Sequence, residues 1–235
     1  MVLENLALCR KRMEAVATGA GRTSTDITLV AVTKGVALPF IYKAIDGGVG
    51  HIGENRVQEA LLKFEPANFY ADTKGRRLIW HMIGHLQTNK VKDAVRLFGL
   101  IHSVDSLRLA EEIDKQAKKI SKVQDLLLEV KISHEATKSG FEPEEALGAV
   151  KEISSFKNIR VNGLMTIAPL FDDPEKTRPY FRKLKELEDK INQLRITDYR
   201  LPILSMGMTD DFQIAIQEGA TMVRIGRGIF GERQK

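Results

Sequence analysis

The sequence predicts an α/β protein folded as a single (β/α)8 TIM barrel with an extra N-terminal helix. Eight short apolar or β-branched runs are nearly all followed by a segment of helical spacing, at about 29 residues per unit. The 235 residues suit this fold, which needs about 250 in one domain. No shift in composition and no linker rich in Pro, Gly or Ser divides the chain. We therefore expect residues 1–235 to form one barrel domain.

The first expected element is an amphipathic helix over residues 1–16, which lacks the apolar core of a signal peptide. Eight expected strands follow it, each recognised by a short run of apolar or β-branched residues. They are residues 27–33, 51–53, 78–83, 100–103, 125–132, 159–165, 202–205 and 222–225.

Helical spacing between the strands, together with capping and stop residues, predicts the remaining helices. Asp105 or Ser106 caps the helix after the fourth strand, and Pro143 lies in the first turn of the next one. Gly219 ends the last helix. The expected helices are residues 38–46, 55–64, 87–98, 107–120, 143–154, 177–194 and 209–218.

An open, doubly wound sheet is the alternative arrangement of these elements. That fold typically carries a G-x-G-x-x-G turn after its first strand. Here Gly35 stands alone after the first expected strand. The sequence therefore favours the closed barrel.

The composition excludes several classes of protein. Apolar residues make up 43% of the chain and charged residues 29%, which rules out a disordered protein. The net charge of +5 arises from interspersed cations and anions, without the basic run typical of a nucleic-acid arm. No stretch reaches the ~20 apolar residues of a membrane helix. We expect a cytoplasmic monomer that binds neither nucleic acid nor membranes.

No metal site is expected either. Cys9 is the single cysteine, so neither an intrachain disulfide nor a cysteine-based zinc site can form. His81, His85 and His102 lack the H-x-x-x-H spacing of a zinc-binding helix and have no cysteine nearby.

In a (β/α)8 barrel the functional site lies at the carboxyl ends of the strands. Residues at this end of all eight expected strands are candidates, and most of them are polar, which a core role alone does not explain. They are Lys34, Glu54, Asn55, Gly84, His85, Ser103, Lys131, Ser133, Met165, Thr166, Ser205, Met206, Arg224 and Gly226.

Lys34 is the most informative of these residues. Seven apolar or β-branched residues precede it and Gly35 follows. A lysine inside a barrel mouth loses hydration, which favours its neutral, nucleophilic amine. Schiff-base chemistry with an aldehyde requires that form. The alternative is a lysine that merely ends its strand and extends its amine into water.

The seventh and eighth units carry a candidate anion site. Residues 205–210 (SMGMTD) indicate a strand end, a glycine turn and a capped helix start, whose N–H groups favour an anion. Residues 224–228 (RIGRG) close the last strand with two glycines that allow close backbone approach. Barrels commonly hold phosphate in these loops, although ordinary tight turns would look alike. Together with Lys34, the pattern suggests a phosphorylated carbonyl substrate or pyridoxal phosphate.

Arg224 bears on the second of these options. Its guanidinium stays charged, so it can only donate a hydrogen bond to a pyridine nitrogen. That nitrogen would stay unprotonated, and the ring would be a poor electron sink. The alternative is an arginine paired with a carboxylate such as Glu54 or Glu129.

Eight motifs, in order, resemble those of the pyridoxal phosphate homeostasis proteins, which are similar to the fold type III barrel domain of bacterial alanine racemases. Any one motif is weak, but the full series is highly specific and covers nearly the whole chain. Residues 137–140 (TKSG), at the start of the fifth motif, are a candidate basic rim for cofactor entry. The motifs are LVAVTKG (29–35), HIGENRVQE (51–59), WHMIGHLQTNK (80–90), HSVDS (102–106), TKSGF (137–141), GLMTI (163–167), LSMGMTDDFQIAI (204–216) and VRIGRGIFG (223–231).

The resemblance implies that pyridoxal 5′-phosphate (PLP) is the cofactor, held as a Schiff base on Lys34. Asn55 matches the residue that lines the cofactor ring, and Arg224 matches the residue that faces the pyridine nitrogen. Ser205 and the backbone after the eighth strand match the phosphate cradle. The cofactor-binding residues expected from the sequence are Lys34, Asn55, Met165, Ser205, Arg224, Gly226 and Arg227.

Alanine racemases carry a further β-rich domain, from which a tyrosine of the partner subunit supplies a second base. Racemisation needs an acid or base on each face of the substrate α-carbon. The present sequence continues for four residues beyond Gly231. The resemblance therefore implies a PLP-binding protein of vitamin B6 homeostasis without robust catalysis, with apo forms of PLP-dependent enzymes as candidate partners. The alternatives are a weak racemase-like PLP enzyme and a Schiff-base aldolase.

Overall fold

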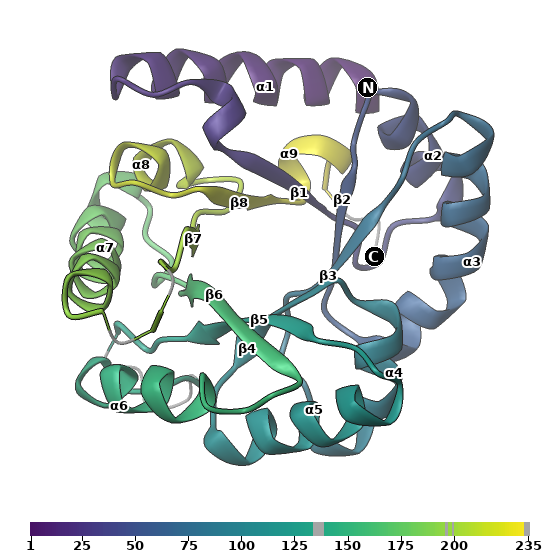
Figure 1. Ribbon diagram of the computed structural model, residues 1–235. Helices are drawn as coiled ribbons and strands as arrows, with labels where there is room; N and C mark the ends of the chain where they lie inside the picture. Colours follow the sequence, from purple (N-terminus) through teal and green to yellow (C-terminus); the bar gives the residue numbers. More distant parts are fainter. Residues whose placement is uncertain (134–138, 196, 199, 233–235) are drawn as a thin grey trace.

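Eight parallel strands close into a barrel, in the order β1 to β8 along the chain (Figure 1). This computed structural model describes residues 1–235 except 134–138, 196, 199 and 233–235. The first and last strands pair directly, with Thr28 opposite Met222 and Ala31 opposite Ile225, and this pairing closes the barrel. Helices surround the strands, so the predicted (β/α)8 barrel is confirmed.

The strands lie close to their predicted positions. They are β1 (Thr28–Val32), β2 (His51–Glu54), β3 (Ile79–Met82), β4 (Leu100–Val104), β5 (Gln124–Glu129), β6 (Ile159–Met165), β7 (Ile203–Ser205) and β8 (Met222–Ile225). β5 differs most, because the sequence predicts that it runs to residue 132. Val130 instead forms an isolated bridge to Phe141, and Ile132 is buried outside the strand. Burial rather than strand pairing explains the apolar pattern beyond residue 129.

The helices follow the strands as expected, with short 3-10 turns at Ser24–Asp26, Thr88–Lys90 and Pro174–Thr177. They are α1 (Val2–Gly19), α2 (Leu38–Asp46), α3 (Val57–Thr73), α4 (Val91–Leu97), α5 (Leu107–Lys119), α6 (Pro143–Ile153), α7 (Arg178–Gln193), α8 (Phe212–Gln217) and α9 (Arg227–Phe230). None of the helices in the described part of the chain is both long enough and apolar enough to cross a membrane.

α3 differs from its prediction because it continues through Pro66 to Thr73, whereas the sequence predicts its end at residue 64. A proline inside a helix removes one hydrogen bond and costs about 3 kcal/mol. Ala60, Ala67 and Ala71 are fully buried at helical spacing in the large core between the barrel and its helices. This packing outweighs the cost of the proline.

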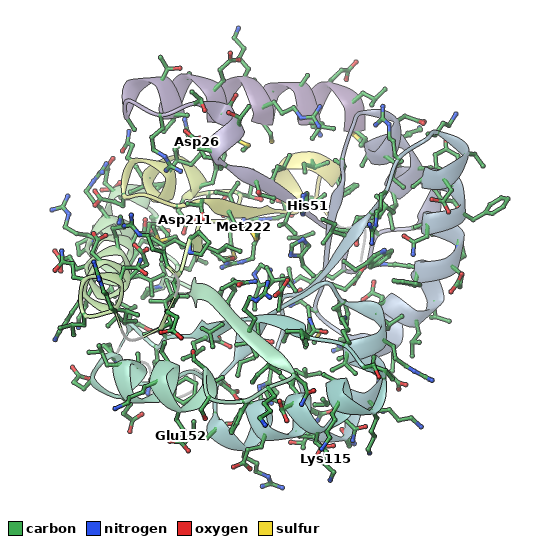
Figure 2. The ribbon with its side chains drawn as sticks, viewed as in Figure 1. Asp26, His51, Lys115, Glu152, Asp211 and Met222 are labelled. Carbon is green, nitrogen blue, oxygen red and sulfur yellow. The ribbon has the colours of Figure 1, made fainter. Side chains whose placement is uncertain are left out.

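Two kinds of side chain fill the interior of the barrel. One small apolar cluster contains a residue from each of five strands, β1, β4, β5, β6 and β8. Side chains from these five strands can meet only inside the barrel. Its members are Val30, Leu100, Leu127, Met165 and Met222. Polar side chains occupy other parts of the interior, and Figure 2 shows His51 inside the same ring of strands as Met222. The barrel is therefore partly polar inside.

The extra helix α1 lies beside α9, α8 and α2 (Figure 1). The Asn5 side-chain amide donates to the Ile229 carbonyl at 3.1 Å, and the Cys9 thiol donates to the Gly228 carbonyl at 3.4 Å. α1 thereby holds the short helix α9 that follows the last strand.

Candidate functional site

A cavity of about 740 Å³ lies at the carboxyl ends of the strands, where the sequence predicts the site. Its walls come from both ends of the chain, because β1 and β8 are neighbours. The structure brings five of the predicted residues into these walls, namely Lys34, Asn55, Arg224, Gly226 and Arg227. The other lining residues are Val32, Ile83, Ile167, Leu170, Met208, Thr209, Asp210 and Glu232. We call this space the mouth cavity.

Met165 and Ser205, also predicted to bind the cofactor, lie elsewhere. Met165 is 1% exposed and belongs to the apolar cluster inside the barrel. Ser205 is fully buried, and its hydroxyl is bonded to Arg224 and His102. The structure therefore places both residues inside the barrel rather than in the wall of the mouth cavity. Alternation along the strands turns these side chains inward, which the sequence alone did not reveal.

Lys34 follows β1 between two peptide groups that α3 holds in place. The Thr33 carbonyl accepts from Lys63 Nζ at 2.6 Å, and the Gly35 N–H donates to Glu59 Oε1 at 2.5 Å. Lys63 Nζ and Glu59 Oε1 are also bonded to each other, at 2.6 Å. The backbone on both sides of Lys34 is thereby fixed to one helix, which positions Lys34 in the cavity wall.

A buried carboxylate completes this arrangement. Glu54 is fully buried at the end of β2, and its Oε1 accepts from the Thr33 hydroxyl at 2.6 Å and from Lys63 Nζ at 2.8 Å. Its Oε2 has no hydrogen-bond partner among the described residues. Burial raises the pKa of Glu54, and the bond from Lys63 opposes that rise. We call Glu54, Glu59 and Lys63 the lysine clamp; sequence reasoning missed Glu59 and Lys63.

Asn55 lies in the cavity wall because Gly84 leaves room for it. A Cβ on Gly84 would lie 2.5 Å from the Asn55 carbonyl oxygen and 2.8 Å from its Cα. Any side chain at position 84 would therefore displace Asn55. Ile83 and Ile167 give the neighbouring wall an apolar surface.

The loop after β7 adds a hydroxyl that sequence reasoning missed. Thr209 lines the mouth cavity, and its Oγ1 accepts from the Gly228 N–H at 3.2 Å, so the hydroxyl hydrogen can serve another acceptor. The Met208 N–H donates to Asp211 Oδ1 at 2.6 Å and closes a turn, so that α8 begins at Phe212 and not at residue 209. The helix start predicted at residue 209 is thus a turn, and this turn still places the Thr209 hydroxyl in the wall of the mouth cavity.

The loop after β8 forms the adjoining wall. The Arg227 guanidinium forms ion pairs with Asp210 and, at 3.3 Å, with Glu232. Gly226 lies between β8 and α9, where the first N–H groups of a helix have no partner within it. This wall therefore offers backbone donors beside a guanidinium that is already paired.

Arg224 is 4% exposed and points from β8 into the barrel. Its Nη1 donates to the Ser205 carbonyl at 2.7 Å and to the Ser205 hydroxyl at 2.6 Å, and its Nη2 donates to the Thr166 carbonyl at 2.9 Å. Burial lowers the pKa of Arg224 to about 10, so the guanidinium remains charged at neutral pH. The alternative pairing with Glu54 is not seen, because Glu54 binds Lys63 and Thr33 instead.

A smaller cavity of about 220 Å³ adjoins the mouth cavity and shares Asn55 with it. Glu129 and Lys131 line it, and burial raises the pKa of Glu129 to about 7. Of the predicted basic rim over residues 137–140, residues 137 and 138 lie outside the described residues, whereas Ser139 lines this smaller cavity. Among the described residues, no group of three or more His, Cys, Asp or Glu side chains is arranged to hold a metal ion.

This chain is similar to known proteins over nearly its whole length. The family profile described as "Alanine racemase, N-terminal domain" matches residues 6–234. A relative from Aquifex aeolicus, named "Pyridoxal phosphate homeostasis protein", is 45% identical over 231 residues, 98% of each chain. The protein of the same name from Escherichia coli K12 is 35% identical over 233 residues, 99% of this chain and 97% of that one.

Solved structures agree with this result. PipY of Synechococcus elongatus, described as "with PLP bound", is 34% identical with a TM-score of 0.84, over 98% of this chain and 100% of that one. A protein described as unknown, from Bifidobacterium adolescentis, is 36% identical with a TM-score of 0.92, over 97% and 94% of the two chains. An alanine racemase of Clostridium difficile is 18% identical with a TM-score of 0.70, over 99% of this chain and 58% of that one, and shares the fold.

Proposed function

Because this chain belongs to the family of pyridoxal phosphate homeostasis proteins, we propose that it binds PLP in the mouth cavity and contributes to the intracellular balance of this cofactor. The proposal rests on one observation above all. Lys34, just after the first strand, and Arg224, on the last strand, line the same cavity as Asn55 and the loops after β7 and β8. A Schiff-base amine, a ring-facing donor and phosphate donors are thus available in one place.

The residues present fit this cofactor. The cavity volume of about 740 Å³ is within the range of small-molecule sites. Lys34 would hold the cofactor covalently as a Schiff base, and Asn55 with its apolar neighbours would border the ring. The Thr209 hydroxyl and the backbone N–H groups of Gly226 and Arg227 would donate to the phosphate. When bound, PLP supplies an aldehyde that condenses with an amine and a ring that can withdraw electrons.

Arg224 limits what the bound cofactor could do. Three of its N–H hydrogens serve the Ser205 and Thr166 oxygens, and the remaining ones, on Nη2 and Nε, have no partner among the described residues. A guanidinium donates and never accepts, so a pyridine nitrogen facing it stays unprotonated. An unprotonated ring withdraws electrons weakly, and this supports a binding protein without robust catalysis.

Delivery of PLP to apo-enzymes is the physiological role that fits such a site. A binding protein that holds its ligand through a reversible Schiff base can release it to a second amine. The proposal includes apo forms of PLP-dependent enzymes as partners, a monomeric state and a cytoplasmic location.

The first test is the visible absorbance of the purified protein mixed with PLP, before and after borohydride. Lys34→Ala is expected to abolish the absorbance of the lysine-bound cofactor and the reduced adduct, while weaker binding through the phosphate persists. Lys131→Ala, which changes a lysine of the adjoining cavity, is the matched control and should keep both. A full-stoichiometry adduct in Lys34→Ala would show that another lysine carries the cofactor.

A second test concerns catalysis. Purified protein loaded with PLP and given L-alanine should form D-alanine at a negligible rate compared with a genuine alanine racemase, measured by a chiral assay. Rapid racemisation that disappears in Lys34→Ala would favour the alternative of a racemase-like enzyme. Rapid retro-aldol cleavage by the cofactor-free protein would favour a Schiff-base aldolase.

A further inference from the structure

Three histidines inside the barrel are hydrogen-bonded in a row. His51 on β2 is bonded through Nδ1 to His81 Nε2 on β3 at 2.9 Å, and His81 Nδ1 is bonded to His102 Nε2 on β4 at 2.9 Å. His81 lies opposite Gly53 in the ladder, and His102 lies beyond Leu100, the partner of His81. Each histidine is therefore two residues nearer the mouth than the one before, and the row climbs through the barrel.

The row ends at the arginine of the mouth cavity. His102 Nδ1 is 2.9 Å from the Ser205 hydroxyl, which accepts from Arg224 Nη1 at 2.6 Å. His81 and His102 are almost completely buried, whereas His51 is half-buried in the wall of a third cavity, at the opposite end of the barrel. The row therefore connects that basal cavity, of about 460 Å³, with the mouth cavity.

The direction of the hydrogen bonds follows from the arginine. A guanidinium can only donate, so Ser205 Oγ is an acceptor towards Arg224. The serine hydrogen then has His102 Nδ1 as its acceptor, and no other acceptor for it is found among the described residues. His102 must carry its hydrogen on Nε2 and donate to His81, which in turn donates through Nε2 to His51. Every imidazole thus directs a lone pair towards the mouth and an N–H towards the base.

The charges around the row agree with this direction. Burial lowers the pKa of His81 to about 3, and burial also lowers the pKa values of His51 and His102, so the imidazoles are neutral. Arg224 has no carboxylate of the described residues within ion-pair distance; Asp211 and Glu129 act on it from further away. A buried cation without a close counter-charge needs oriented dipoles around it.

We propose that His51, His81, His102 and Ser205 act as one polarised hydrogen-bond chain that positions Arg224 and compensates its charge from inside the barrel. The lone-pair end of each group faces the guanidinium, so their dipoles add. The role of the chain in cofactor binding rests on the function proposed above, because it acts through the arginine that would face the ring. The four residues are positioning residues and do not touch the ligand.

The hydrogen-bond chain is sensitive to protonation at its basal end, where His51 lines the basal cavity. A proton added to His51 would have to occupy Nδ1, which already accepts from His81. Such a proton would force the hydrogens of His81 and His102 onto Nδ1, and Ser205 would lose the acceptor of its own hydrogen. Arg10 and Glu14 line the basal cavity beside His51 and are the other charged groups that face it.

The direct test is the position of the imidazole hydrogens in the cofactor-free protein, measured by nitrogen-15 NMR with histidine labelling. His51, His81 and His102 are expected to be neutral with the hydrogen on Nε2 at pH 7. His85→Gln, which changes an exposed imidazole, is the control and should leave these signals in place. A hydrogen on Nδ1 of His81 or His102, or a charged imidazole at either position, would overturn the proposal.

A pair of variants at His81 tests the positioning of Arg224. His81→Phe interrupts the chain, whereas a glutamine at this position can still accept from His102 and donate to His51. Hydrogen exchange of the Arg224 guanidinium in the cofactor-free protein should be faster in His81→Phe and near wild type in His81→Gln. The dissociation constant for PLP should rise about tenfold in His81→Phe alone. Equal behaviour of the two variants would exclude a role for the chain.

The outcomes for the two proposals are separable. If the histidines have the predicted tautomers but the protein does not bind PLP, the proposed function is wrong and the hydrogen-bond chain stands. If the protein binds PLP but the histidines have other tautomers, only the proposal of the hydrogen-bond chain is wrong. If His81→Phe does not fold, the tautomers of the wild-type protein decide.

Discussion

Two hydroxyls, one on the last residue of β7 and one in the loop that follows, show how the direction of a side chain decides which cavity it reaches. Ser205 ends the strand, and its hydroxyl is used inside the barrel by Arg224 and His102. Thr209 lies beyond the turn at Gly207, whose φ of 91° favours glycine. Thr209, and not Ser205, lines the mouth cavity. The phosphate donor of this loop is therefore expected to be the threonine.

Thr209→Val removes the hydroxyl and keeps the shape of the side chain. A hydrogen bond to a charged phosphate contributes about 1.5–3 kcal/mol, so the dissociation constant for PLP should rise about ten- to a hundredfold. Binding of unphosphorylated pyridoxal should change little, and Thr209→Ser should behave like the wild type. The measurement is a titration of cofactor-free protein with each ligand. Equal losses for both ligands would place the phosphate elsewhere.

At the scale of elements, α3 does more than cover the barrel. It carries Glu59 and Lys63, which fix the peptide groups on both sides of Lys34. In the sequence these two residues look like a solvated ion pair at helical spacing, because nothing local shows that Lys63 is only 8% exposed. The barrel, the order of its strands and the position of Lys34 could be predicted from periodicity. The lysine clamp could not be predicted, since it depends on how closely α3 packs against β2.

Lys63→Met should destabilise the cofactor-free protein by about 3–5 kcal/mol, because it leaves the buried Glu54 carboxylate without its cation. Denaturant unfolding measures this loss. Adding Glu54→Gln to Lys63→Met should restore part of the stability, since no buried charge then remains unpaired. Lys74→Met, at an exposed position just beyond the helix, is the control and should change the stability by less than about 0.5 kcal/mol. A loss no larger than that of the control would show that the clamp is not a buried ion pair.

On the scale of the whole molecule, the polar row makes the barrel interior acid-sensitive. The pKa of His81 is lowered from 6.5 to about 3. Between these two pH values the unfolded chain binds a proton on this imidazole and the folded protein does not. The contribution of this residue to stability is therefore complete above pH 6.5 and is lost as the pH falls towards 3.

His81→Gln isolates this effect because glutamine does not titrate. The free energy of unfolding of the wild type, relative to this variant, should fall by about 1.4 kcal/mol for each pH unit below 6.5. Denaturant unfolding between pH 7.5 and pH 4.5 measures the difference, with His85→Gln as the matched control. A constant difference across this range would mean that His81 is protonated in the folded protein as readily as in the unfolded chain.

The pairing of β1 with β8 also has a consequence for biosynthesis. Lys34 leaves the ribosome roughly 190 residues before Arg224, which takes about 10 to 40 s at ordinary translation rates. During that interval the amine has neither the facing arginine nor the loops after the last two strands beside it. If Lys34 binds PLP as proposed, the complete binding site forms only after the last strand has been translated, and a nascent chain stalled before β8 should not yet bind the cofactor.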